Sequence, residues 1–135
     1  MNFTPDYVRQ NNKVPKELQG AYSKIIKAGV ELMLNEKTRP ATLKYLSGEG
    51  PAAQKLGEGT AGLMLYLFQR SNKTMPPQLI IPAGVELLAE GADMMRKAGA
   101  EVSDADIAEA VVVMIETMAP KFGVEPGQLI QGAAK

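Results

Sequence analysis

The strongest constraint on this chain is a repeated spacing: apolar residues recur at steps of three and four, the period of one helical face. Prolines and glycines interrupt this pattern where helices are expected to begin and end. The chain offers no convincing pair of strands, so we expect an all-α fold, a compact bundle of five to six helices. The expected helices span residues 15–35, 39–46, 51–70, 82–97, 104–118 and 126–131, with an extended connector at 71–78.

Several helix ends are marked by residues with a known terminal preference. Pro15 and Pro82 are expected to open helices, because a proline at the first helical position loses no hydrogen bond. Asn35 and Gly99 suit helix exits, where a left-handed residue often stands. Ser103, followed three residues later by Asp106, resembles a shortened capping box and predicts a helix start.

The length of 135 residues suits one domain, so residues 1–135 are expected to form a single helical unit. The first nineteen residues contain no apolar stretch of the secretory type, which favours a cytoplasmic site of synthesis. The segment 63–68 is apolar on every side, so this helix should be central in the core or face a partner. Shallow membrane insertion through 59–68 would also use these residues, but a buried helix explains them more simply.

The chain contains no His and no Cys, which removes the commonest general base, the thiolate nucleophile and the usual transition-metal ligands. Asp104-x-Asp106 lacks the later glycine and glutamate of a calcium loop. The glycine-rich segments 48–51 and 57–62 do not match a phosphate-binding loop. We therefore expect no catalytic residue, no metal site and no cofactor, in a protein that is not an enzyme.

Two segments of the chain are nearly identical. Residues 25–32 and 80–87 agree at seven of eight positions, with Lys27 replaced by Pro82. Duplication of a helical hairpin would explain the match and would give two pseudo-repeated halves. Chance recurrence of common helix residues would also explain it. In both cases the Ala-Gly pair removes side-chain bulk and would let a neighbouring helix approach closely.

The net charge of zero conceals an uneven distribution. Residues 1–73 carry eleven Lys/Arg and six Asp/Glu, whereas residues 74–135 carry four and nine. Opposite charge at two ends of the fold would favour head-to-tail contacts between copies. If the halves instead pack side by side, the charges neutralise each other within one molecule. The sequence leaves both arrangements open.

The candidate interface residues follow from these patterns. Nucleic-acid binding is disfavoured, because the basic residues of the first half are scattered over several faces, although Tyr22 and Tyr45 would offer stacking. The expected protein interfaces are a basic set, an apolar set and an acidic set that includes one valine. These sets are Lys13, Lys16, Lys24 and Lys27; Leu63, Tyr66 and Phe68; and Glu101, Asp104, Glu109, Val113 and Glu116.

In overall style the chain resembles the small helical accessory proteins of tailed-phage virions. The resemblance rests on the Ala-Gly-Val-Glu-Leu helices, the glycine-interrupted apolar helix 57–68, the closing segment 125–131 and the lack of catalytic residues. It implies a structural role in a symmetric multi-copy assembly, with other copies or other virion proteins as partners and the virion as location. The alternative is a monomeric helical adaptor or regulator that binds a host protein or nucleic acid through its basic N-terminal half.

Overall fold

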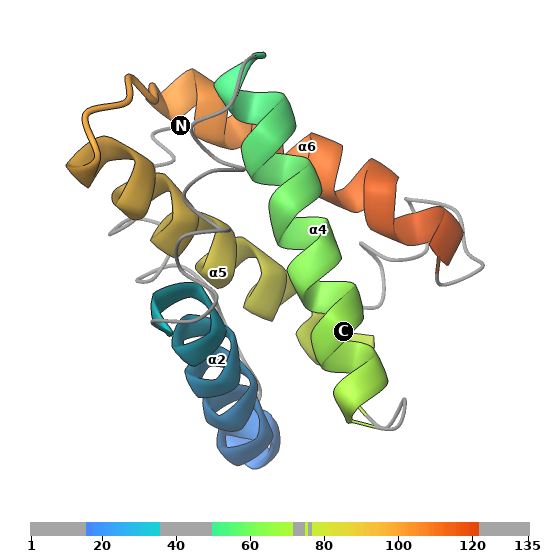
Figure 1. Ribbon diagram of the computed structural model, residues 1–135. Coiled ribbons are helices and arrows are strands. Elements are labelled where there is room, and N and C mark those ends of the chain that lie inside the picture. The colour runs from blue at the N-terminus through green and yellow to red at the C-terminus, as the bar shows by residue number, and fades with distance from the viewer. Residues whose placement is uncertain (1–15, 36–49, 72–74, 76, 122–135) are drawn as a thin grey trace.

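The computed structural model describes residues 16–35, 50–71, 75 and 77–121, and these residues form helices and no strand (Figure 1). The all-α prediction is therefore confirmed for this part of the chain. The segments 39–46 and 126–131, also expected to be helical, lie outside the described residues. The described elements are the 3-10 turn η1 (Lys16–Leu18) and the helices α2 (Gln19–Leu34), α4 (Ala52–Arg70), α5 (Pro77–Lys97) and α6 (Asp104–Lys121).

Helices α4 and α5 each pack against the three other α-helices of the described residues. The contact of α4 with α6 is the most extensive among these helices, and Figure 1 shows α4 crossing in front of α6. Met64 and Leu67 of α4 are buried in the core, as expected for the apolar segment 63–68. Tyr66 on the same segment is 44% exposed, so the helix is central without being enclosed on every side.

The core is formed by large aliphatic and sulfur-containing side chains from all four α-helices. Burial of each such side chain contributes about 1.5–3 kcal/mol, so this cluster supplies most of the stabilisation. Six of the eight methionines are buried, and their flexible side chains can fill irregular gaps between crossing helices. The largest fully buried residues are Leu56, Met64, Leu79, Leu87, Leu88, Ile107, Met114 and Met118.

Glycines mark the closest approaches between helices. A Cβ added to Gly57 of α4 would lie 2.7 Å from the Ala110 carbonyl oxygen and 2.6 Å from Val113 Cβ of α6. Real Cβ atoms essentially never come this close, so the α4–α6 contact requires glycine at this position. Val113 thus lies inside the α4–α6 contact. Val113 belongs to the acidic set predicted as an interface, and the structure places its Cβ against α4 instead.

The glycines of the two near-identical segments both lie at helix contacts. Gly29 of α2 meets Leu87 of α5, whose Cδ1 would be 2.6 Å from an added Cβ. Gly84 of α5 meets Met114 of α6, whose Sδ would be 2.9 Å away. In both segments the glycine of the Ala-Gly pair therefore makes room for a side chain of another helix, Leu87 of α5 in one case and Met114 of α6 in the other.

Helix α5 begins earlier than the sequence predicts. It starts at Pro77 rather than Pro82, and Pro82 lies inside the second turn. An internal proline costs a helix about 3 kcal/mol, because one hydrogen bond is lost and the ring crowds the preceding turn. Leu79 and Ile80 are buried in the core, and their burial offsets this cost. The expected extended connector at 71–78 is correspondingly shorter.

The turn from α5 to α6 is closed at both ends by backbone and side-chain hydrogen bonds. Gly99 has a φ of +93°, and its amide and that of Ala100 donate to the carbonyls of Arg96 and Met95. This is the Schellman pattern, which satisfies the last carbonyls of a helix. The predicted exit at Gly99 is confirmed. Asn35 differs, because it follows α2 in an extended conformation (φ −61°, ψ 135°) and not in the left-handed one.

Candidate interaction surfaces

One exposed face of α2 carries the lysines expected at an interface. Lys24 and Lys27 are exposed, and Glu31 and Leu34 continue the same line at steps of four and three residues. Lys16 is exposed on the preceding turn η1, whereas Lys13 lies outside the described residues. Leu34 is 50% exposed, an unusual position for a large aliphatic side chain. We call Lys24, Lys27, Glu31 and Leu34 the α2 face.

A second exposed line runs along α6 and is acidic. Glu109, Val112 and Glu116 are exposed and follow one another at steps of three and four residues. Val112 is 51% exposed, the highest value among the large apolar residues of the described chain. We call these three residues the α6 face. It places Val112 between two glutamates, whereas the α2 face carries Lys24 and Lys27 at one end and Glu31 and Leu34 at the other.

The exposed valine of α6 is Val112, whereas the sequence pattern predicts Val113. The spacing of Glu109 and Glu116 allows either Val112 or Val113 to lie between them, and Val113 was predicted. The structure turns Val113 towards Gly57 and leaves Val112 outside. Glu109, Val113 and Glu116 follow one another at steps of four and three residues, and Glu109, Val112 and Glu116 do so at steps of three and four, so helical spacing alone offers no signal that identifies Val112.

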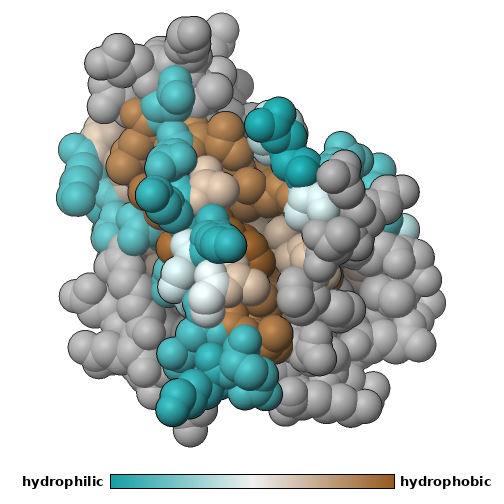
Figure 2. Space-filling model, turned by 90° about the horizontal axis from the view of Figure 1, so that it is seen from below, coloured by the Kyte–Doolittle hydropathy of each residue, from teal (hydrophilic) through white to brown (hydrophobic). Residues whose placement is uncertain are grey.

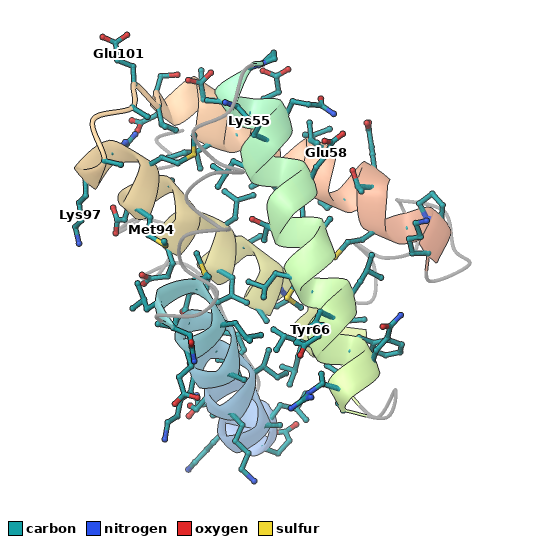
Figure 3. All side chains as sticks on the ribbon, viewed as in Figure 1. Lys55, Glu58, Tyr66, Met94, Lys97 and Glu101 are labelled. Carbon is teal, nitrogen blue, oxygen red and sulfur yellow. The ribbon has the colours of Figure 1, made fainter. Side chains whose placement is uncertain are left out.

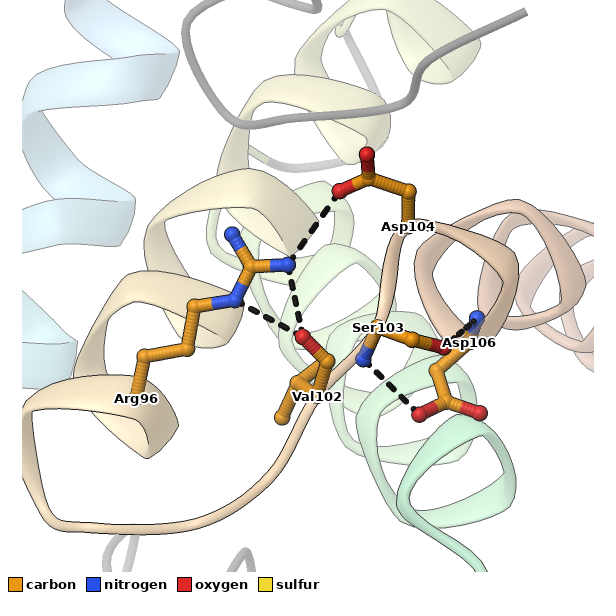
Figure 4. Close-up of polar contacts among 5 residues, drawn as sticks. All are labelled: Arg96, Val102, Ser103, Asp104 and Asp106. Atoms are coloured by element: carbon orange, nitrogen blue, oxygen red, sulfur yellow. Dashed lines mark hydrogen bonds and ion pairs between the residues drawn. The ribbon is translucent and has the colours of Figure 1, made fainter.

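Two acidic residues at the start of α6 are engaged within the molecule (Figure 4). The backbone amide of Ser103 donates to the Asp106 carboxylate at 2.9 Å, and the Asp106 amide donates to the Ser103 hydroxyl oxygen at 3.0 Å. The predicted capping box is thus confirmed. Asp104 accepts a hydrogen bond from Arg96 Nη2 at 3.3 Å. Asp104 therefore serves the α5–α6 junction as well as lying near the acidic face.

Glu101 lies in the α5–α6 turn and is exposed, and Figure 3 shows its side chain pointing away from the helices, as does that of Lys97. The structure does not bring Glu101 into line with Glu109 and Glu116, because those residues follow the length of α6. The acidic set predicted from the sequence is therefore divided between the turn, the helix start and the outer line of α6.

The apolar residues predicted on α4 do not form one exposed surface. Leu63 and Phe68 are partly buried and pack against the core. Tyr66 is exposed, and the Arg70 guanidinium carbon lies 5.7 Å from the centre of its ring, within the range of a cation–π interaction. Of the three predicted residues, Tyr66 is the one that a second molecule can reach directly.

The two charged faces belong to different parts of the molecule. In Figure 1, α5 lies between α2 and α6, so the α2 face does not meet the α6 face within one copy. The two halves of the chain are not segregated as wholes, however, because α4 from the basic half packs along α6. Figure 2 shows that hydrophobic residues also reach the surface, in a band beside hydrophilic side chains.

The described residues contain no arrangement of three or more acidic side chains that could hold a metal ion. Within the same residues, every buried side-chain nitrogen or oxygen has a hydrogen-bond partner. The single buried polar residue of this part, Thr60, donates its hydroxyl to the Leu56 carbonyl at 2.7 Å. No helix among the described residues is long and apolar enough to cross a bilayer. The exposed residues of the α2 face and the α6 face are therefore the features from which we argue a function.

Comparison of the chain with protein-family models, with curated proteins and with solved structures finds no significant match.

Proposed function

We propose that this chain is a non-enzymatic structural protein that joins copies of itself head to tail within a multi-copy assembly, as a component of a phage virion. The supporting observation is the complementarity of the α2 face and the α6 face. One presents Lys24 and Lys27 with Leu34, and the other presents Glu109 and Glu116 with Val112. The virion setting rests on the compositional resemblance alone.

The geometry of the two faces favours contacts between copies. Because α5 separates α2 from α6, the lysines of one copy can meet the glutamates of another without rearrangement. Such a contact joins two different surfaces, so each copy retains one unused face, and repetition gives a ring or a filament.

Each contact of this kind is weak. An exposed ion pair contributes only about 0.2–1 kcal/mol, because water and salt screen the charges. Two such pairs would give a contact that forms at high local concentration and breaks readily. That strength suits a subunit that assembles in many copies or on a scaffold of other virion proteins.

A charge-swap experiment tests the proposal. The variant Lys24→Glu/Lys27→Glu makes the α2 face acidic, and Glu109→Lys/Glu116→Lys makes the α6 face basic. Each variant alone should lose head-to-tail association and the larger assemblies, because its two faces then carry like charge. Mixed in equal amounts, the two variants should associate again, since each offers the charge that the other lacks. Light scattering after size exclusion would measure the mass of all three samples.

The matched control is Lys97→Glu, which reverses an exposed lysine at the end of α5 and should leave the mass unchanged. The proposal fails if the wild-type chain stays monomeric at high concentration and low salt. It also fails if the two double variants associate as well separately as they do when mixed.

The adaptor alternative has less support from the described residues. Tyr22, one of the two tyrosines considered for base stacking, is partly buried between α2 and α5 and donates its hydroxyl hydrogen bond to Glu86 at 3.0 Å. Its ring is therefore engaged in the helix contact. Retention on DNA that disappears when Lys16 and Lys24 are mutated would favour the alternative.

A further inference from the structure

Gly62 is not explained by the packing of its own molecule. Four other helical glycines each face a side chain that would lie less than 3.0 Å from an added Cβ; they are Gly29, Gly57, Gly84 and Gly91. A Cβ added to Gly62 would meet nothing within 4 Å. Gly62 also lies in the middle of α4, where glycine costs about 1 kcal/mol relative to alanine. Gly20 is equally open, but it lies in the first turn of α2.

The surroundings of Gly62 form a continuous exposed line on α4. Glu58, Gly62, Tyr66 and Arg70 are all exposed and follow one another at four-residue steps. Such rows form ridges, which in the commonest class of helix crossing fit into the grooves between the ridges of the other helix. Gly62 makes a low point between two larger side chains, at which a second helix can come close. We call these four residues the α4 ridge.

The order of charges along the α4 ridge indicates what covers it. Glu58 lies on one side of Gly62, and Tyr66 lies at the same distance on the other side (Figure 3). The Arg70 guanidinium is held over the Tyr66 ring, so the positive charge is positioned near Tyr66. The ridge is therefore negative on one side of its low point and positive on the other.

We propose that the α4 ridge binds the α4 ridge of a second copy, antiparallel and crossing at Gly62. In this arrangement Glu58 of each copy faces Tyr66 and Arg70 of the other, and the pair forms twice by two-fold symmetry. A parallel arrangement would place Glu58 against Glu58 and Arg70 against Arg70, which is unfavourable. The contact uses neither the α2 face nor the α6 face, so it is independent of the head-to-tail contact.

The absence of cysteine from the chain allows a direct test by disulfide formation. Glu58→Cys and Tyr66→Cys would be prepared as separate single-cysteine proteins and oxidised alone and in an equal mixture. A disulfide requires Cα atoms about 4.4–6.8 Å apart, so its yield reports which residues face each other. We expect the mixture to give a 58–66 disulfide in severalfold higher yield than either protein gives with itself. One Glu58–Tyr66 contact stays intact in the mixed dimer.

Two controls make the result specific. Ser23→Cys is exposed on α2 and should cross-link poorly with either protein. Adding Gly62→Leu to both cysteine proteins should abolish the 58–66 disulfide by filling the low point. The space around Gly62 is open, so the monomer should remain folded by circular dichroism and should melt no earlier.

The proposal is overturned if the 58–66 yield does not exceed that with Ser23→Cys, or if each protein cross-links with itself as well as in the mixture. It is also overturned if Gly62→Leu leaves the yield unchanged. Charge reversal on α2 and α6 should remove the larger assemblies and leave the 58–66 disulfide.

Discussion

At the scale of single residues, Arg96 connects the end of α5 to the turn that follows it and to the start of α6. Its Nε and Nη2 groups donate to the Val102 carbonyl at 2.8 and 2.6 Å, and Nη2 also reaches Asp104 (Figure 4). One side chain at the end of α5 thereby fixes the turn and the start of α6. The planar guanidinium is suited to this, because its donors have a fixed mutual geometry.

Replacing this guanidinium by an ammonium should weaken the junction. We expect Arg96→Lys to lower the free energy of unfolding by about 1–2 kcal/mol, because a single ammonium cannot reproduce two parallel donors and the contact with Asp104. Urea denaturation followed by circular dichroism would measure the loss. The neighbouring Lys97→Ala, at an exposed position, should change it by less than about 0.5 kcal/mol. Equal effects of the two variants would contradict the assigned role.

A second residue-scale prediction concerns the contact of α2 with α5. Tyr22 donates to Glu86 Oε1 at 3.0 Å, and its hydroxyl also lies 3.4 Å from the Pro82 carbonyl oxygen. Tyr22→Phe keeps the ring and removes the hydroxyl, so it should cost about 0.5–1.5 kcal/mol in unfolding free energy. Differential scanning calorimetry would show a lower melting temperature. Tyr66→Phe, at an exposed position, is the matched control and should leave it unchanged.

At the scale of the elements, the fit between α4 and α6 depends on Gly57. The nearest atoms to an added Cβ belong to the Ala110 backbone and to the β-branched Val113, and neither can move aside like a flexible side chain. The two helices must separate slightly to admit a methyl group. This separation would disturb the most extensive helix contact of the molecule.

Two alanine substitutions on the same helix should therefore have opposite effects. Gly57→Ala should destabilise the fold by about 1–3 kcal/mol through overpacking. Gly62→Ala should stabilise the monomer by about 0.5–1 kcal/mol, because the helix gains propensity and no contact is disturbed. Urea titration at low protein concentration, where monomers dominate, would measure both. Changes of the same sign would refute the assignment of Gly57 to a close contact.

Among the helices, the ends that depend on nearby residues could be predicted from the sequence, whereas the packing between distant residues could not. The capping box of Ser103 and Asp106 and the exit at Gly99 were predictable, because each depends on residues within a few positions of one another. Pro82 was misread, because the burial of Leu79 and Ile80 that outweighs its cost comes from other helices. The orientation of Val113 depends on Gly57, a residue more than fifty positions away. Local patterns do not encode such pairings.

The same division holds for the candidate surfaces. Lys24, Lys27, Glu109 and Glu116 were predicted at interfaces from their charge, and all four are exposed in the structure. Periodicity could not separate Val112 from Val113, because both lie close to the boundary of the buried stripe. The sequence also could not predict that Gly62 has open space around it, because some helical glycines contact a neighbouring helix and others face water.

At the scale of the whole molecule, the zero net charge conceals basic and acidic residues that lie on different surfaces. If the α2 and α6 faces join copies, the mean mass in solution should fall as salt rises. The screening length shrinks from about 10 Å at ~0.1 M to about 3 Å at ~1 M, which weakens exposed charge pairs. Sedimentation velocity at both ionic strengths would measure the change. A mass that stays constant or rises with salt would argue against association by charge.

Oxidation of the buried methionines would report how often the helices of this molecule separate. Oxidation converts a thioether into a polar sulfoxide, which a packed apolar core does not accommodate. Peroxide can reach sulfur atoms such as those of Met64, Met114 and Met118 only when the helices around them separate. Met94 is partly exposed and needs no such event. The delay between sulfoxide formation at Met94 and at the buried methionines therefore measures how often the helices separate. A molecule that is oxidised while its helices are apart should not regain its packed core.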